Sequence, residues 1–85
     1  MFEEVYATFQ WKRYKIIWTK HSLERMKQRW IDVNLVVSCI ENYDRFYESY
    51  DKKVVEKEYK TNILRTIFNI QTNNIILITT MFLWK

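Results

Sequence analysis

The chain contains neither glycine nor proline among its 85 residues, and this absence limits both its turns and its chemistry. Glycine enters left-handed turns without a steric cost, so other residues must build every tight turn, and Asn and Asp are expected at these positions. The absence also excludes glycine-rich phosphate loops, dinucleotide-binding glycine fingerprints and the glycine-flanked nucleophile turn of hydrolases. Most classes of nucleotide-binding enzyme are thereby excluded.

The length and composition of the chain indicate a single folded domain. Its 85 residues and 10.7 kDa allow one hydrophobic core, because two cores would each be marginal in size. Hydrophobic residues make up 48% of the chain and aromatic residues 18%, which is enough apolar surface to offset the entropy of ordering it. We therefore predict one domain over residues 1–85, in which residues 1–11 are an N-terminal extension that fits a helix and an edge strand equally well.

The side-chain types argue against a metal or cofactor site. The chain has one cysteine, Cys39, and one histidine, His21, so it lacks paired zinc ligands and cannot form an internal disulfide. We expect no metal and no cofactor, and we expect Cys39 to be a small buried hydrophobe. No stretch has the roughly 20 apolar residues of a membrane span, and the N-terminus does not read as a secretion signal. The sequence thus favours a soluble cytoplasmic protein with no membrane partner.

Residues 12–42 are expected to form one strand followed by two short helices. Residues 12–19 are rich in β-forming side chains. Thr19 and Asp32 each stand before a segment with helical spacing and are the expected N-caps. Asn42 is expected to end the second helix in a left-handed conformation. The predicted core stripe of the first helix consists of Leu23, Met26 and Trp30.

The rest of the chain alternates with period two and predicts strands joined by short turns. The expected strands cover residues 44–51, 53–60, 62–70 and 75–82. The last two are apolar on both faces, which is typical of central strands covered on both sides. The predicted fold class is therefore α+β, with one strand and then two short helices packed on a four- to five-stranded, mainly antiparallel sheet.

The positive charge of the chain is concentrated in one segment. The formal net charge is +4, and residues 11–31 alone hold seven Lys or Arg side chains against one acid, a net +6. On the expected helix in this segment, His21, Arg25 and Arg29 recur every four residues and so form one stripe. The stripe fits either a solvated helix face or an anion site, because guanidinium groups grip phosphate oxygens and a histidine can move a proton near neutral pH.

The segment His21–Ile31, HSLERMKQRWI, carries a resemblance to a known family. Together with Val36, Val37 and the IEN ending at Asn42, it resembles the small domains of unknown function related to RelE/ParE and BrnT toxins, which have an H-x-x-E-R-M-x-x-R helix. The resemblance covers about residues 13–82. It implies a RelE-like α+β fold and a role as the toxin of a toxin-antitoxin pair, acting as a metal-independent endoribonuclease of the mRNA interferase type.

The same resemblance leaves a second function open, because relatives in this superfamily differ in activity. In that alternative the chain is a non-enzymatic RelE/ParE-like protein that binds nucleic acid, gyrase or an acidic antitoxin. The partners to expect are RNA, free or on the ribosome, an acidic antitoxin protein, and a second copy of the chain in a homodimer. Trp30 stands where relatives commonly have glycine, which restricts the junction between the helices and offers a ring on which a base can stack.

The polar residues of the family correspond to particular positions of this chain. By motif position the catalytic candidates are His21, Glu24, Arg25, Arg29 and Arg65. The candidates for RNA binding are Lys20, Lys27, Trp30, Lys57 and Thr79, with Thr80 as an alternative hydroxyl. If the chain cleaves RNA, His21 would transfer one proton, and Glu24, Lys57, a tyrosine, the substrate or solvent would serve the second transfer. The arginines would stabilise the charge that accumulates on phosphorus.

Structural roles compete with these assignments. His21 fits a hydrogen bond at the start of its helix equally well, and Glu24 fits an ion pair with a neighbouring lysine. Arg65 lies in an expected strand, where its guanidinium can pair with Glu56 or Glu58 across the sheet. The tryptophans are expected in the core or at an interface, because their rings carry large apolar areas. The residue pattern by itself leaves both sets of roles open.

Overall fold

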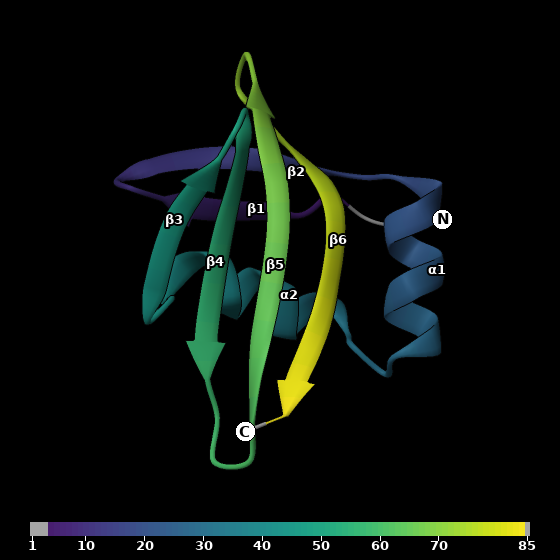
Figure 1. The fold of residues 1–85 in the computed structure, drawn as a ribbon. Helices are drawn as coiled ribbons and strands as arrows, with labels where there is room; N and C mark the ends of the chain where they lie inside the picture. Colours follow the sequence, from purple (N-terminus) through teal and green to yellow (C-terminus); the bar gives the residue numbers. More distant parts are fainter. Residues whose placement is uncertain (1–3, 85) are drawn as a thin grey trace.

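The computed structural model describes residues 4–84, which form a six-stranded sheet and two α-helices (Figure 1). In chain order the elements are β1 (Tyr6–Phe9), β2 (Lys12–Trp18), α1 (Lys20–Gln28), α2 (Val33–Glu41), β3 (Arg45–Ser49), β4 (Lys52–Glu58), β5 (Asn62–Gln71) and β6 (Asn74–Trp84). Thr19 and Asp32 cap the two helices as predicted, and each side chain accepts the backbone N–H of the residue three positions later. Neither described helix has the length and apolar character that crossing a membrane requires.

The sheet is mixed and strongly curled. Its strand order is β1-β2-β6-β5-β4-β3, and all neighbours run antiparallel except β2 and β6, which are parallel. In Figure 1, β1 and β2 run nearly crosswise to the other four strands. α2 contacts β1, β4 and β5 on the inner side of the curl, whereas α1 contacts β6. A parallel pair needs a long connection, which the helices and three strands between β2 and β6 supply.

The predicted fold class is wrong in the number and direction of the strands. The RelE-like arrangement expected from the resemblance had one strand before the helices and a four- to five-stranded, mainly antiparallel sheet, whereas the structure has two strands before the helices and a six-stranded mixed sheet. The additional strand, β1, lies within residues 1–11, which fitted a helix and a strand equally well. A tight turn at Gln10 and Trp11 folds β1 onto β2, so that Ala7 and Phe9 are buried in the core.

The turns use left-handed residues of unexpected types. The described residues with a positive φ are Gln10, Trp11, Trp30, Tyr50 and Thr72. The prediction that Asn and Asp would take these positions is wrong, and Asn42, expected to be left-handed, has a φ of −129°. A residue with a Cβ atom is destabilised by roughly 1–2 kcal/mol in the left-handed conformation. The packing of the elements on either side of each turn must offset that cost.

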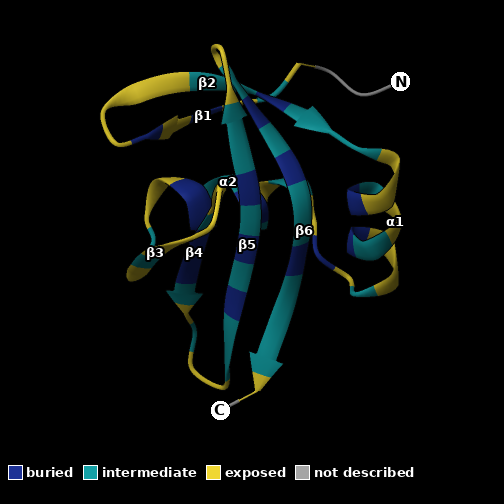
Figure 2. Ribbon diagram, turned by 45° about the horizontal axis from the view of Figure 1, so that its top comes forward, coloured by how far each residue is buried: buried dark blue, intermediate teal, exposed yellow. Residues whose placement is uncertain are grey.

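The core lies between the inner face of the sheet and α2. Side chains along most of β5 alternate between buried and half-buried, as the dark blue and teal bands of Figure 2 show. β6 has one extra residue where the pairing shifts from Ile67–Thr79 to Phe68–Leu77, and this bulge changes which residues face inward. Leu77 and Thr80 are therefore both fully buried although they are three positions apart.

Cys39 is buried in α2, as predicted. It has no exposed surface, and its thiol donates weakly to the carbonyl oxygens of Val55 and Leu64, at 3.7 and 3.4 Å. Burial raises the pKa of the Cys39 thiol to about 11, because the protein interior does not solvate a thiolate. Cys39 is therefore a core residue and is not activated as a nucleophile.

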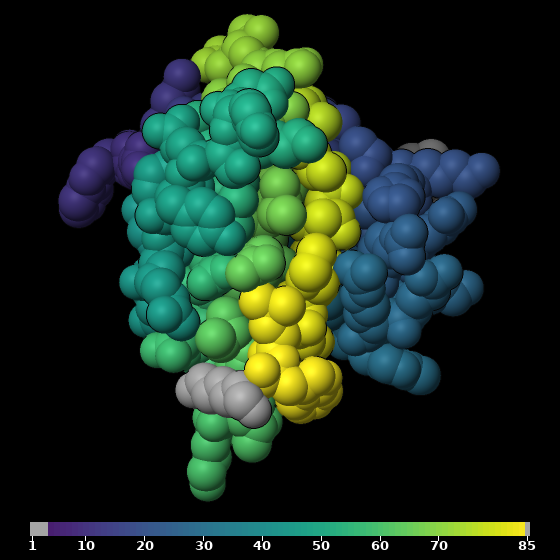
Figure 3. Space-filling view, in the orientation of Figure 1, coloured from purple at the N-terminus to yellow at the C-terminus, as the bar shows by residue number. Residues whose placement is uncertain are grey.

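The outer face of the sheet is open. β5 and β6 were expected to be covered on both sides, but in the part of the chain from residue 4 to residue 84 no element packs over their outer face. Figure 3 shows this face from the front, with side chains of β4, β5 and β6 at the surface. The apolar outward side chains of β5 and β6 are half-buried, because they are shielded by their neighbours in the sheet and not by a helix.

Candidate functional site

The hydroxyl of Thr19 attaches the start of α1 to β6. The Thr19 hydroxyl accepts the backbone N–H of Ser22 at 3.1 Å and donates to the carbonyl oxygen of Leu77, also at 3.1 Å. The Ser22 hydroxyl donates to the carbonyl oxygen of Thr19 at 2.8 Å, and Ser22 is fully buried. Ser22 has a small side chain, which fits this close contact. The bond from Thr19 to Leu77 fixes the start of α1, and with it His21, near β6.

Arg29 attaches the other end of α1 to β6. β2 pairs with β6 as far as Leu77, and no described strand pairs with this edge of β6 beyond that point. The Arg29 guanidinium donates through Nη1 to the carbonyl oxygen of Thr80 at 2.8 Å, so a side chain serves this carbonyl where a strand is lacking. α1 thus lies beside β6 where a neighbouring strand is lacking, and Arg29, the last residue of its basic stripe, contacts this otherwise open edge.

The predicted stripe of His21, Arg25 and Arg29 is present on α1. Arg25 donates from Nε to Nε2 of His21 at 3.4 Å, and Arg29 follows one turn later. His21 is exposed, whereas the two arginines are half-buried. Neither arginine pairs with an acidic side chain of the described chain. We call these three residues, together with β6 residues 80–84, the α1–β6 seam.

A groove opens at the Arg29 end of the seam. It has a volume of about 360 Å³ and is lined by Arg29, Met81, Phe82 and Trp84. Trp84 is 76% exposed, so its ring is free to meet a ligand beside the guanidinium. Figure 3 shows this end of β6, in yellow, next to α1, in blue. The three β6 residues were not among the predicted site residues, because only the strand pairing places them beside Arg29.

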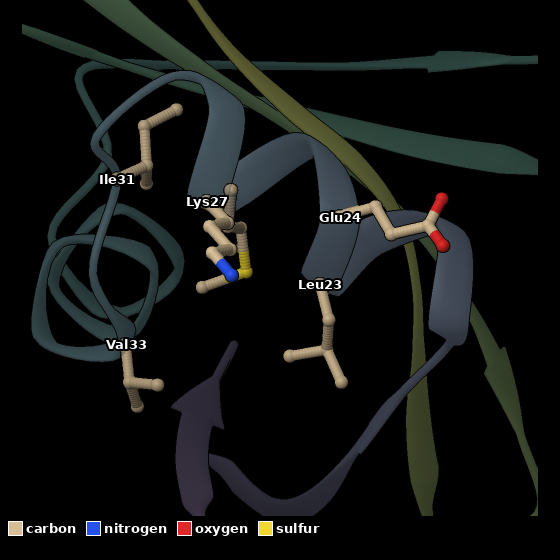
Figure 4. Close-up of a pocket in the computed structure, with 6 residues that line it drawn as sticks. Leu23, Glu24, Lys27, Ile31 and Val33 are labelled. Atoms are coloured by element: carbon tan, nitrogen blue, oxygen red, sulfur yellow. The ribbon is translucent and has the colours of Figure 1, made fainter.

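Glu24 does not join His21 in the structure. No hydrogen bond links the two side chains, and Glu24 was one of several groups expected to serve the second proton transfer. Figure 4 shows the Glu24 carboxylate pointing away from Leu23 and Val33. Glu24 lines a second hollow, of about 370 Å³, whose other residues are Leu23, Met26, Lys27, Ile31 and Val33. That hollow is mainly apolar and lies between α1 and the start of α2. Within residues 4–84, no three His, Cys, Asp or Glu side chains gather to hold a metal ion.

Arg65 belongs to an ion-pair cluster on the outer face. Its Nε lies 2.7 Å from Glu56 Oε2, and Nε of Arg45 lies 3.4 Å from the other carboxylate oxygen. Glu56 is only 6% exposed, so the two guanidinium groups compensate a charge that has lost most of its water. The predicted pairing of Arg65 with Glu56 is confirmed. It turns this guanidinium towards β4, whereas the seam lies on the other side of β6.

The lysines and the threonine predicted to bind RNA divide between two places. Lys57, on β4, donates to the carbonyl oxygen of Asn42 at 3.1 Å and is separated from β6 by β5. Lys20 and Lys27 are exposed on α1, and no ion pair of the described chain involves them. Thr79 is half-buried on β6. The structure therefore brings Lys20, Lys27 and Thr79 to the two elements of the seam and leaves Lys57 apart.

Trp30 is a surface residue, so its assignment to the core stripe is wrong. Its side chain is 90% exposed and its φ is 57°, whereas Met26 is buried and Leu23 is half-buried, as expected. Glycine adopts this left-handed conformation without a steric cost, which explains why a glycine suits the junction between the helices. Trp18 is the tryptophan that packs against the core.

The comparison with protein families matches residues 18–82 to a family described as Domain of unknown function (DUF4258). No curated protein matches the chain, and no solved structure matches it. The relation to RelE/ParE and BrnT toxins therefore stays a prediction. The family match covers well over half of the chain, including both helices and most of the α1–β6 seam. On this evidence the chain belongs to the DUF4258 family.

Proposed function

We propose that this domain binds single-stranded RNA along the α1–β6 seam. The observation that carries the proposal is the environment of Arg29. One nitrogen of its guanidinium donates to the carbonyl oxygen of Thr80, and no acidic side chain of the described chain pairs with the others. A guanidinium that is fixed in orientation and not neutralised is suited to grip the oxygens of a phosphate group.

The groove beside Arg29 suits a nucleotide whose base is unstacked. Met81 and Phe82 supply an apolar wall and Trp84 an exposed ring, around a volume of about 360 Å³. A base of any type can stack on such a ring while its phosphate lies against the arginine. The bases of a duplex are already stacked and paired, so we expect single strands to bind more tightly than duplexes.

The charge around the seam supports a ligand that carries several phosphates. α1 and its C-cap, residues 20–29, hold four Lys or Arg side chains against Glu24 alone, a net charge of +3, and Arg25 lies one turn before Arg29. A strand running along α1 would place successive phosphates near these two side chains. Binding should therefore weaken as salt is added, because bound phosphates release their counterions. An acidic antitoxin, which stays a prediction, would compete for the same cations.

The test is a titration of a fluorescein-labelled RNA of about ten nucleotides, followed by fluorescence anisotropy at low salt. We expect Arg29→Ala to weaken binding roughly tenfold, equivalent to about 1.4 kcal/mol. Arg29→Lys keeps the charge but loses the planar donor fork, so its affinity for the RNA should lie between those of wild type and Arg29→Ala. Lys60→Ala is the matched control, because Lys60 is exposed in the β4–β5 connection and its loss also removes one charge. Its affinity should stay within about twofold of wild type.

Two results would contradict the proposal. Arg29→Ala could bind the RNA as tightly as Lys60→Ala, which would show that only the net charge matters. A duplex of the same length could bind as tightly as the single strand, which would show that the groove takes no unstacked base.

Metal-independent cleavage of the bound RNA is the second candidate, and the His21–Arg25 contact favours it. Arg25 Nε lies 3.4 Å from Nε2 of His21, so a guanidinium stands beside the imidazole. When Arg25 turns from Nε2 to a bound phosphate, the lone pair of that nitrogen is released and can take the proton of a 2′-hydroxyl. Arg25 would then stabilise the charge on phosphorus. No second proton-transfer side chain contacts His21 among the described residues, so the substrate or solvent would protonate the leaving oxygen.

Cleavage is tested separately from binding by incubating end-labelled RNA with the protein in EDTA. If the second candidate holds, wild type releases fragments that end in a 2′,3′-cyclic phosphate, and His21→Ala binds the RNA normally but does not cut it. A wild-type protein that binds this RNA without cutting it would leave the binding function in place and remove the enzymatic one.

A further inference from the structure

A pocket of about 280 Å³ lies at the β1–β2 turn. Its lining residues are Thr8, Gln10, Trp11, Glu41 and Tyr43. In Figure 1 the turn is at the far left and α1 at the right, so the pocket and the α1–β6 seam occupy opposite sides of the molecule. None of the five lining residues has a part in the RNA-binding proposal, and the pocket is argued independently of it.

Glu41 places a fixed negative charge in this pocket. It is the last residue of α2 and is exposed, and its Oε2 accepts the backbone N–H of Thr8 at 2.8 Å. This bond satisfies an outward N–H of β1, which is an edge strand of the sheet. No Lys or Arg of the described chain pairs with Glu41, and its second oxygen has no hydrogen-bond donor there. The carboxylate is held in place and its charge is not neutralised.

Trp11 displays its ring at the pocket despite a conformational cost. Its φ is 72° and its side chain is fully exposed, so it loses stability from the left-handed backbone and recovers none by burial. Gly or Asn would form this turn more favourably. Strained residues cluster at ligand sites, but Tyr50 is just as strained and exposed, so it is the position in the lining of the pocket that distinguishes Trp11.

Tyr43 supplies a second ring, and its position is set by the core. Its centroid lies 5.9 Å from that of Phe9 and 5.8 Å from that of Phe46. Tyr43 is half-buried, so part of its surface remains open to the pocket. The pocket therefore combines one anchored ring, one free indole and one carboxylate.

The neighbouring tyrosines of the hairpin already carry cations. The Arg13 guanidinium lies 4.4 Å from the ring centre of Tyr6, and Lys12 Nζ lies 5.3 Å from that of Tyr14. No described cation lies over either ring of the pocket. Because the indole of a tryptophan attracts cations more strongly than a tyrosine ring does, Trp11 is the unused cation site of this hairpin.

We propose that this pocket binds an organic cation, an alkylammonium or guanidinium group, between the Glu41 carboxylate and the rings of Trp11 and Tyr43. The carboxylate neutralises the charge of the ligand, and the rings accept its apolar, weakly hydrated surface. Such a group occurs in small free metabolites and in the arginine or lysine side chains of a basic peptide. Two probes separate these sources.

The experiment is an NMR titration of the isotope-labelled protein that follows the indole N–H of Trp11 and the backbone N–H of Thr8. Tetramethylammonium chloride represents a free cation, and N-acetyl-arginine amide represents a peptide side chain. Potassium chloride at equal ionic strength and uncharged tert-butyl alcohol are the ligand controls. We expect saturable shifts in the millimolar range with at least one cation and none with the controls. The cation that binds more tightly identifies the source.

Variants locate the binding. Trp11→Ala and Glu41→Gln should each weaken the binding of the cation roughly fivefold. The amide oxygen of Glu41→Gln can still accept the Thr8 N–H, so this variant keeps the fold and removes only the charge. Tyr50→Ala and Glu48→Gln are the matched controls, because Tyr50 is a fully exposed ring with a φ of 59° and Glu48 is an exposed acid, both outside the pocket.

Three outcomes would overturn the proposal. Neither cation could give a saturable shift, tert-butyl alcohol could shift the same signals equally, or Glu41→Gln could bind the cation as tightly as wild type. Thermal unfolding of each variant shows whether a loss of binding comes from a loss of the fold.

Discussion

The α1–β6 seam and the pocket at the β1–β2 turn are built in the same way but carry opposite charges. In the seam, Arg29 donates to the backbone carbonyl of Thr80 at 2.8 Å, and in the pocket Glu41 accepts the backbone N–H of Thr8 at 2.8 Å. Both bonds serve backbone groups at a strand edge that has no neighbouring strand. An exposed tryptophan lies beside each charged group.

Both proposed sites lie at open edges of the sheet. An edge strand leaves polar backbone groups unpaired, and a charged side chain that satisfies one of them is held in a fixed orientation. The remaining atoms of that side chain keep their charge at the surface. The sign of that charge is the reason why we propose an anionic ligand at Arg29 and a cationic ligand at Glu41.

The cluster around Glu56 differs from both, because its charged groups neutralise one another and stabilise the fold. The Glu56 carboxylate is 6% exposed between Arg45 and Arg65. Glu56→Gln leaves Arg65 without an acid, while Arg45 keeps Glu58 at 3.4 Å. We expect this variant to lower the free energy of unfolding by about 3 kcal/mol, measured by urea denaturation. Glu48→Gln, at the exposed pair with Lys53, should cost less than about 1 kcal/mol. Equal losses would show that the buried cluster around Glu56 stabilises the fold no more than an exposed ion pair does.

The free energy of unfolding is expected to fall at alkaline pH because of Cys39, which lies in the core. The pKa of this thiol is raised from 9.0 to about 11, so the folded protein keeps a proton that the unfolded chain loses first. Stability from this group is complete below about pH 9 and falls as the pH rises towards 11. Between about pH 8 and about pH 10.5 the wild type should lose about 2 kcal/mol more than Cys39→Ala does, measured by urea denaturation. Parallel pH profiles of the two proteins would refute this account of Cys39.

Reversing the two charges tests directly whether the seam and the pocket bind ligands of opposite charge. Arg29→Glu should weaken RNA binding at least about tenfold, or about 1.4 kcal/mol, and leave tetramethylammonium binding unchanged. Glu41→Lys should do the opposite, with loss of the cation and normal RNA binding. The two ligands are titrated into both variants by anisotropy and by NMR. A folded variant that loses both ligands would show that the two regions are not separate sites, and one that loses neither would show that the reversed charge does not hold its ligand.

Replacing the left-handed tryptophans by glycine should have the smallest effect and separates strain from function. Trp30 and Trp11 have φ values of 57° and 72° and exposed rings. Trp30→Gly and Trp11→Gly should each raise the free energy of unfolding by roughly 0.5–1 kcal/mol, because the steric cost disappears. Only Trp11→Gly should also lose tetramethylammonium binding. A fall in stability on urea denaturation would instead reveal a packing role for the ring.

The candidate site was predicted from the sequence in part. The stripe of His21, Arg25 and Arg29 follows from helical spacing and is present in the structure. The groove residues and Glu41 were missed, because their roles depend on which strand lies beside which. Arg65 shows the same limit, since its sequence position allowed both a substrate role and a pair with Glu56 and only the register of β4 and β5 joins it to that acid.

The sequence alone determined the features that depend on residues a few positions apart. The helix starts at Thr19 and Asp32, the core role of Met26 and the burial of Cys39 belong to this group, because caps and periodicity act within one or two turns. The tertiary structure decided the strand order, the parallel β2–β6 pair and the identity of the open edges. These depend on contacts such as that between Thr19 and Leu77, which lie 58 positions apart, and no local pattern specifies which distant segments will meet.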